Sequence, residues 1–224
     1  MFYNNRYCLF FFFTLLYVNA FAQLADPNQT PFAYGISAGV YSSSANPKQV
    51  SIIDKKSVAG FSIGGVASFR MKTYFLETGL NYISEGYAYS TAIENKNTVN
   101  KISNEYKFYA IMVPLKLAIP IRSKYGRHLP SIALNFSLPT KQTLFQTIEY
   151  NNAPLVKNVY NVSSDYKAFT PSFSLAYGIE FDIDIIYAVR FEPTFQFTFL
   201  NANSTQFKTN ISNIGLKCNL LFLR

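Results

Sequence analysis

The sequence predicts an all-β fold: an eight-stranded antiparallel transmembrane β-barrel with an up-and-down meander. Three observations lead to this prediction: an N-terminal export signal, strand-length segments whose residue character alternates with a period of two, and connections that are alternately short and long. Charged residues make up 14% of the chain, whereas an average soluble domain contains roughly 25%. Such a low charged fraction is typical of proteins with a lipid-facing belt.

The first 22 residues have the three regions of a cleavable signal peptide. Arg6 supplies the positive region, residues 8–18 are apolar, and Ala20-Phe21-Ala22 forms a small-x-small cleavage site. The apolar run is too short to cross a bilayer as a helix, which needs about 20 residues. We therefore expect residues 1–22 to be removed on export and residues 23–224 to form a single outer-membrane β-barrel domain, without a disulfide because one cysteine remains.

The first four predicted strands each present two different faces. They span residues 32–43, 58–70, 74–92 and 105–120. The first two carry one face of small residues (Gly35, Ser37, Gly39, Ser62, Gly64, Ser68), and the next two carry a large, uncharged face (Leu76, Leu80, Tyr82, Tyr109, Ile111, Leu115). Because successive side chains of a strand point to opposite sides, this alternation indicates extended chain between two different environments.

The last four predicted strands continue the pattern. They span residues 129–140, 168–181, 185–200 and 207–222. In residues 185–200 one face carries Phe191, Phe195 and Phe197, and the other carries Arg190 and Glu192. All eight segments are long enough to cross a membrane obliquely, which takes about 9–11 residues.

The connections between these strands differ in length. Residues 71–73, 121–128 and 182–184 are short, and residues 44–57, 93–104, 141–167 and 201–206 are mostly longer and polar. Outer-membrane barrels have short periplasmic turns and long extracellular loops. The chain therefore has both termini on the periplasmic side. Pro114, Pro171 and Pro193 fall inside strands, where we expect each to mark a bulge, a bend or the rim.

The two faces indicate which side meets lipid. Small side chains are needed where strands curve around the narrow interior of an eight-stranded barrel. The large faces, with Tyr and Phe towards the strand ends, suit a lipid-facing belt between aromatic girdles. A soluble sandwich or lipocalin also alternates, and it remains the alternative at this point.

Several segments resemble a known family. Val113-Pro114-Leu115-Lys116-Leu117, residues 174–180, Phe191-Glu192-Pro193 and residues 211–222 are similar to the PorT-like outer-membrane β-barrel family. The resemblance implies an eight-stranded barrel in a Gram-negative outer membrane. Its expected partners are outer-membrane lipid and lipopolysaccharide, the barrel assembly machinery, and secretion or surface proteins. The last residues, Leu223-Arg224, depart from the terminal aromatic that is usual in such barrels.

Charged residues on the small faces predict an ionic network inside the barrel. The residues are Arg70, Glu77, Lys116, Glu180, Arg190, Glu192 and Lys217. Buried ions must pair or lose their charge, and three acids beside four bases can pair almost completely. We expect these residues to fill the lumen as a structural plug, with a gate or proton path as the alternative.

The sequence gives little support for catalysis or cofactors. His128 is the single histidine of the chain and falls in a predicted periplasmic turn, so we expect no enzyme activity. Cys218 lies on the apolar face of the last strand, and one His with one Cys does not make a zinc site. We expect no cofactor. Nucleic acid is also excluded as a partner of this exported chain, although its formal net charge is +8.

The connection 141–167 is the expected contact surface. It is the longest loop, and it carries Tyr150, Lys157, Tyr160, Tyr166 and Lys167, a composition suited to protein or anionic-sugar partners. We therefore expect a non-enzymatic outer-membrane protein that acts through its loops in a structural, secretion-accessory or surface-binding role. A small channel or ligand transporter is one alternative, and a soluble lipocalin-like binding barrel is another.

Overall fold

The computed structural model describes residues 31–45, 52–71, 73–92, 99–124, 126–150, 154–163, 169–201 and 208–224. The expected signal peptide lies outside these residues. The strands are β1 (Phe32–Ala45), β2 (Ile52–Lys56), β3 (Val58–Arg70), β4 (Phe75–Ala92), β5 (Val99–Ala118), β6 (Ile121–Ser123), β7 (Gly126–Tyr150), β8 (Val156–Asn161), β9 (Thr170–Asp182), β10 (Tyr187–Asn201) and β11 (Lys208–Leu223).

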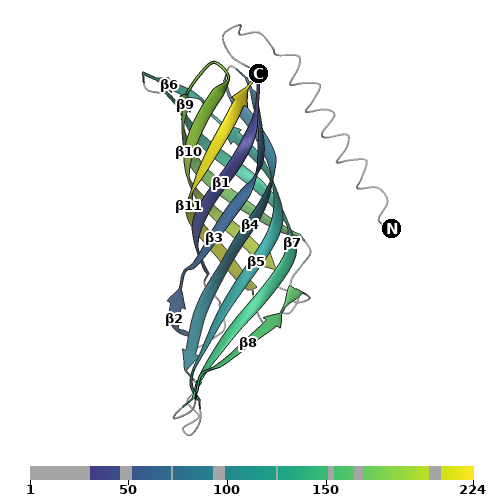
Figure 1. Ribbon diagram of the computed structural model, residues 1–224, viewed down its shortest axis with the longest axis vertical. Coiled ribbons are helices and arrows are strands. Elements are labelled where there is room, and N and C mark those ends of the chain that lie inside the picture. The colour runs from purple at the N-terminus through teal and green to yellow at the C-terminus, as the bar shows by residue number, and fades with distance from the viewer. Residues whose placement is uncertain are drawn as a thin grey trace, which may run out of the picture.

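Eight of these strands close into a ring (Figure 1). The order around it is β1, β3, β4, β5, β7, β9, β10 and β11, and β11 pairs with β1. Every pairing is antiparallel, so the chain is an up-and-down meander. The eight predicted strands are confirmed in number and order. Within the described residues no α-helix is long and apolar enough to cross a membrane.

The predicted loops contain more strand than expected. The connection 141–167 is wrong as a loop, because β7 runs on to Tyr150 over a length of 25 residues and β8 pairs back onto it. In the same way, β2 occupies part of the connection 44–57 and pairs with β4. Backbone pairing holds these segments, in which apolar residues do not alternate strictly with polar ones, and this is why the period of two did not identify them.

The two ends of the barrel differ in shape. At one end lie the short turns, the β6–β7 hairpin and the C-terminus (Figure 1). At the other end β4, β5 and β7 continue beyond the ring, with β2 against β4 and β8 against β7. We call this second part the extension: β2, β8 and the adjoining ends of β4, β5 and β7.

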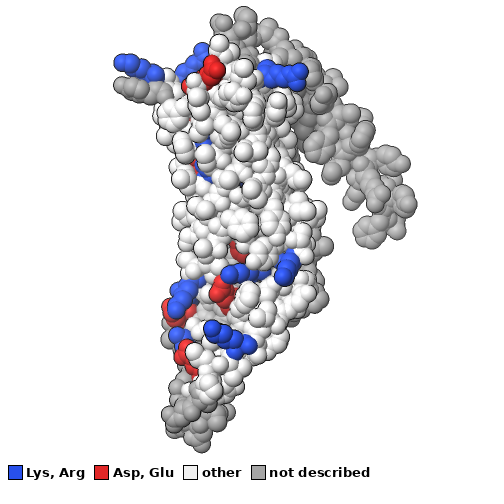
Figure 2. Space-filling view, viewed as in Figure 1, with Lys and Arg blue, Asp and Glu red and all other residues white. Residues whose placement is uncertain are grey.

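The outer surface of the ring is apolar. Side chains that point outward include Ile36, Ile63, Leu80, Leu134 and Leu175, all of which are exposed. Figure 2 shows that Lys, Arg, Asp and Glu gather mainly towards the two ends and leave a largely uncharged belt between them. Aromatic rings border the belt: Tyr34 and Tyr187 contact Phe222 near the short turns, and Tyr82 contacts Phe61 and Tyr109 nearer the extension. This arrangement is that of a transmembrane barrel.

Two of the three strand prolines interrupt a ladder without shifting its register. Pro171 lies at the start of β9, near the rim as expected. Pro114 and Pro193 lie within strands, where the pairings of β5 with β4 and of β10 with β9 each lack two rungs but keep the same register on both sides. Of the bulge, bend or rim expected at each proline, the bulge is therefore excluded at these two positions. Proline lacks the N–H of one rung, and the neighbouring rungs hold the strands together.

Candidate functional site

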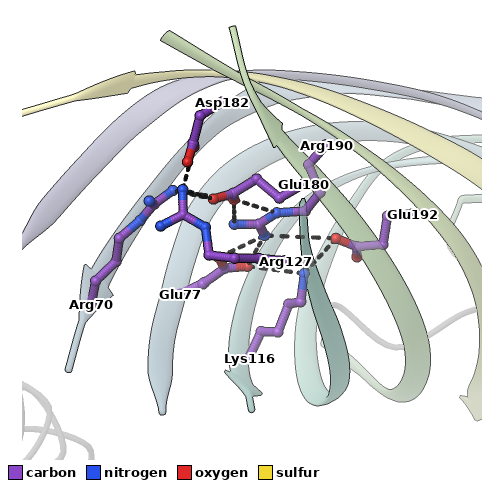
Figure 3. Close-up of polar contacts among 8 residues, drawn as sticks. All are labelled: Arg70, Glu77, Lys116, Arg127, Glu180, Asp182, Arg190 and Glu192. Atoms are coloured by element: carbon purple, nitrogen blue, oxygen red, sulfur yellow. Dashed lines mark hydrogen bonds and ion pairs between the residues drawn. The ribbon is translucent and has the colours of Figure 1, made fainter. Parts of the chain in front are cut away.

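The predicted charged residues converge inside the barrel (Figure 3). Arg70 of β3, Glu77 of β4, Lys116 of β5, Glu180 of β9, and Arg190 and Glu192 of β10 point toward one another from different parts of the ring. Arg127 of β7 and Asp182 of β9 complete this group, which we call the inner cluster. Its four acids and four bases balance in formal charge. The period of two in the sequence was enough to predict that the central members lie on the lumen-facing side of their strands.

Arg190 is the centre of the inner cluster. Its Nη1 donates to both carboxylate oxygens of Glu77, at 2.6 and 2.8 Å, while its Nη2 and Nε donate to Glu180 Oε2 at 2.7 and 3.0 Å. Arg190 and Glu180 are 0% exposed and Glu77 is 2% exposed. Such fork-shaped contacts fix both orientation and distance, and they satisfy charges that would be costly to bury alone.

The remaining members bind to this centre from two sides. Lys116 Nζ lies 2.9 Å from Glu77 Oε2 and 2.5 Å from Glu192 Oε2. On the short-turn side, Arg70 Nη2 donates to Glu180 Oε2 at 3.1 Å, and Arg127 Nη2 lies 2.9 Å from Glu180 Oε1 and also donates to Asp182. Each buried acid therefore contacts at least two cations, so the cluster ties together β3, β4, β5, β7, β9 and β10.

Gly178 leaves the space that Arg190 occupies. A Cβ built on Gly178 would lie 3.1 Å from Arg190 Cδ and 3.3 Å from Leu129 Cβ. Leu129 in turn packs with Phe75 and Ala118 in a buried apolar cluster, and the Arg70 guanidinium lies over the Phe75 ring at 5.2 Å. Gly178 thus has a direct role in packing the cluster.

Lys217 faces the lumen but lies apart from the ion pairs. Its Nζ stands 5.9 Å from the centroid of the Tyr41 ring, and none of the ion pairs formed by the described residues includes it. It lines a cavity of about 40 Å³ together with Glu77, Lys116 and Glu192. This volume has room for roughly three water molecules. The plug and the gate or proton path both remain predictions for this charged group.

A second polar group fills the lumen nearer the extension. Asn213 Nδ2 donates to Glu85 Oε2 at 2.6 Å, and Thr198 Oγ1 donates to the same oxygen at 3.3 Å. Gln196 Nε2 lies 3.2 Å from Thr198 Oγ1. All four side chains are buried, and among the described residues no Lys or Arg forms an ion pair with Glu85. We call these four residues the outer cluster.

Aromatic rings cover the outer cluster on the extension side. Tyr87 is stacked on Tyr106 at 4.9 Å between ring centroids and on Phe108 at 5.9 Å. Tyr89 and Ile211 belong to the same buried group. Ions at one level, amides and hydroxyls at the next and rings above them occupy successive levels of the described lumen. This arrangement can close a barrel; it does not place a nucleophile beside a base.

Sequence reasoning missed Arg127, Asp182 and Glu85. The first two were assigned to turns, although Asp182 follows Glu180 at the lumen-facing period of two and Arg127 precedes Leu129 in the same way. Glu85 shares its strand and its parity with Glu77. Extending the alternation by one residue pair would have found Arg127 and Asp182, whereas Glu85 already lies inside the predicted strand 74–92.

The other predicted positions are distributed over the surface. His128 lies near the short turns, where its Nδ1 is 2.9 Å from the Tyr177 hydroxyl and its Nε2 is 3.2 Å from Ser123 Oγ. Cys218 is exposed on the outward face of β11. Tyr150 ends β7, and Lys157 and Tyr160 are exposed on β8. Tyr166 and Lys167 lie outside the described residues.

The solved structures similar to this chain include two bacterial proteins, NspA and Ail. Neisserial surface protein A (NspA) is 12% identical with a TM-score of 0.44, covering 84% of this chain and 96% of its own. Ail, the attachment invasion locus protein of Yersinia pestis, solved in complex with the heparin analogue sucrose octasulfate, is 11% identical with a TM-score of 0.39, covering 85% and 99%.

The sequence itself matches a family of membrane proteins. None of the curated proteins matches the chain. The model of the family described as "Outer membrane protein beta-barrel domain" matches residues 21–211. That stretch takes in the ring from β1 into β11, including the inner cluster and the extension. The chain therefore belongs to the outer membrane protein β-barrel domain family.

Proposed function

We propose that this protein is a non-enzymatic, non-conducting outer-membrane barrel whose extension is a contact surface for a protein or glycan partner at the cell surface. The proposal includes membership of the PorT-like group, on the resemblance of residues 113–117 and 174–180, and a secretion-accessory or surface-binding role. Outer-membrane lipid, lipopolysaccharide and the barrel assembly machinery are the partners that any such barrel requires.

One observation carries the proposal: the wall of the barrel continues beyond its membrane belt as a paired sheet. β7 has 25 residues and β5 has 20, whereas about 9–11 residues cross the membrane. Unpaired loops would suffice to join the strands, so a rigid sheet held by β2 and β8 at its flanks is extra structure. Ordered strands that present exposed side chains make a preformed binding surface at low entropic cost.

The closed lumen supports a contact role over a transport role. The inner cluster joins opposite sides of the ring with ion pairs of 2.5–3.1 Å, and the cavity beside it measures about 40 Å³. A solute larger than water would have to break several buried ion pairs to pass. Purified protein in planar bilayers should therefore show no single-channel steps. Steps of defined size in the parent protein would favour the channel alternative instead.

A shortened hairpin tests the contact surface. Replacing residues 146–158 with an Asn-Gly turn keeps Phe145 opposite Val159 and removes the end of the extension. We expect this variant to fractionate with outer membranes and to keep the heat-dependent gel shift of a closed barrel. It should fail to rescue the phenotype that deletion of the whole protein produces.

The matched control lies at the opposite end of the barrel. Arg122 is exposed in β6 near the short turns. The Arg122→Ala variant should rescue the deletion as fully as the parent does. Full rescue by the shortened hairpin would overturn the proposal, and failure of the Arg122 variant would point to the short-turn end. A water-soluble, detergent-independent monomer would favour the lipocalin-like alternative.

A further inference from the structure

The extension has two edge strands that differ in kind. Within the described residues β2 pairs only with β4, and β8 pairs only with β7. Strand edges offer backbone N–H and C=O groups to other chains, and proteins usually block them with charges, bulges or very short strands. The two edges of this sheet therefore show which side is protected against added strands.

The β2 edge carries these protective features. Three of its five residues are Asp54, Lys55 and Lys56, and Lys56 lies 3.8 Å from Asp54. Its register with β4 shifts between Ile52 and Asp54. Charge and irregular pairing both disfavour a further strand on this side.

The β8 edge lacks them. Its six residues contain one charge, Lys157, and keep a regular register with β7. Val159 is 65% exposed and Tyr160 is 45% exposed. A regular, weakly charged and partly apolar edge is the form that accepts an added strand.

The register identifies the backbone groups that face outward. Val162 N donates to Gln142 O at 3.1 Å, so this pair is of the hydrogen-bonded type. Antiparallel pairs alternate between bonded and non-bonded types, and Asn158 and Tyr160 therefore bond to β7. Lys157, Val159 and Asn161 alternate with them, so their N–H and C=O groups point away from β7.

Side chains near this edge define the chemistry of the partner. Val159 lies opposite Phe145 of β7, which is also exposed, so the two form an apolar strip beside the edge. The Lys107 ammonium lies over the Phe145 ring and pairs with Glu105, whereas Lys157 carries the charge of β8 itself. An acidic residue suits a position opposite Lys157, and an apolar one suits a position beside Val159.

We propose that β8 is the docking edge of this protein and that it receives an extended, acidic–apolar segment of another exported polypeptide as an added antiparallel strand. The proposal rests on the function proposed for the extension and names its partner chemistry. Copies in one membrane share their orientation, so two β8 edges would meet parallel, the less stable mode of pairing. A separate polypeptide can approach in the antiparallel direction.

The test uses the full-length protein in lipid nanodiscs and a synthetic probe. The probe is a fluorescent ten-residue peptide with alternating Val and Thr and one central Glu. A second peptide has the same side chains, but alternate backbone amides, those that would donate to β8, are N-methylated. We expect the first peptide to bind and the N-methylated one to bind at least tenfold more weakly, because only the backbone donors differ. Equal binding of the two peptides, or no binding by either, would overturn the proposal.

Two substitutions at one position separate backbone from side chain. Val159→Pro removes an N–H that faces the free edge and leaves the β7 ladder complete, whereas Val159→Thr keeps that N–H. The proline variant should lose at least tenfold in peptide affinity, and the threonine variant should lose less than threefold. A third peptide carries Lys in place of the central Glu. The Lys157→Glu variant should bind this Lys peptide more tightly than the Glu peptide, the reverse of the parent protein. The heat-dependent gel shift checks that each barrel is closed.

Rescue of the deletion phenotype distinguishes this inference from the proposed function. If the shortened hairpin fails to rescue while Val159→Pro rescues fully, the extension is the contact surface but strand addition is wrong. If both rescue fully, the proposed function itself fails. A third outcome is that the parent protein self-associates and the Val159→Pro variant does not. In that case the edge pairs with a second copy, and the peptide proposal is overturned.

Discussion

The inner and outer clusters occupy the same lumen with different chemistry. In the inner cluster Arg190 contacts Glu77, Glu180 and Glu192, and every buried acid has more than one cationic neighbour. In the outer cluster Glu85 accepts from an amide and a hydroxyl. Removing one member of an ionic network leaves buried charges of both signs unpaired, whereas removing one hydrogen bond to Glu85 leaves no cation unpaired. The two levels should therefore differ sharply in their tolerance of substitution.

The largest effect is expected at Arg190. Arg190→Ala leaves the buried carboxylates of Glu77 and Glu180 without their main partner. It should lower the free energy of unfolding by about 3–5 kcal/mol. Urea unfolding of the protein in lipid vesicles, followed by the gel shift, measures this loss. Combining Arg190→Ala with Glu192→Gln tests coupling within the cluster. If both variants unfold like the parent, the inner cluster does not hold the barrel together.

A pair of matched substitutions compares the two acids of β4. Glu77→Gln removes a charge that Arg190 and Lys116 both contact, at 2.6 and 2.9 Å, and should cost about 3 kcal/mol. Glu85→Gln keeps an oxygen that can accept from Asn213 and leaves no cation unpaired, so it should cost less than about 1 kcal/mol. The same unfolding measurement applies to both. Equal losses would mean that the two levels do not differ in kind.

The sequence predicted the inner cluster better than the extension, and the reason is physical. A wall between lipid and a narrow lumen forces strict alternation, so Arg70, Glu77 and Arg190 share a face that can be read directly. Strands in water on both sides carry no such signal. In residues 143–150 and β8 apolar residues do not alternate strictly with polar ones, so the period of two does not reveal their pairing.

The covering rings of the outer cluster should matter less than the ions. Tyr87 stacks on Tyr89, Tyr106 and Phe108 with centroids 4.9–6.3 Å apart. Tyr87→Leu keeps an apolar side chain but loses the stacked contacts, and should cost about 1–2 kcal/mol. The inner cluster remains in place in this variant, so planar bilayers should still show no channel steps. Channel steps after this single change would mean that the rings, and not the ions, close the lumen.

The smallest effect on stability is expected at Cys218. This residue gives the sharpest test of which residues of β11 face the lumen. Both clusters depend on the alternation that places Lys217 and Asn219 inside and Cys218 outside. In lipid vesicles an apolar maleimide should label Cys218 much faster than a charged, impermeant one, with no measurable change in unfolding. The matched control carries Cys218→Ser and Asn219→Cys together, and its buried thiol should react slowly with both reagents. Rapid labelling of the control with slow labelling of the parent would mean that the register of β11 is shifted by one residue. Such a slip turns every side chain to the other face. It would therefore place Lys217 and Asn213 outside the lumen and leave Glu85 without its Asn213 partner.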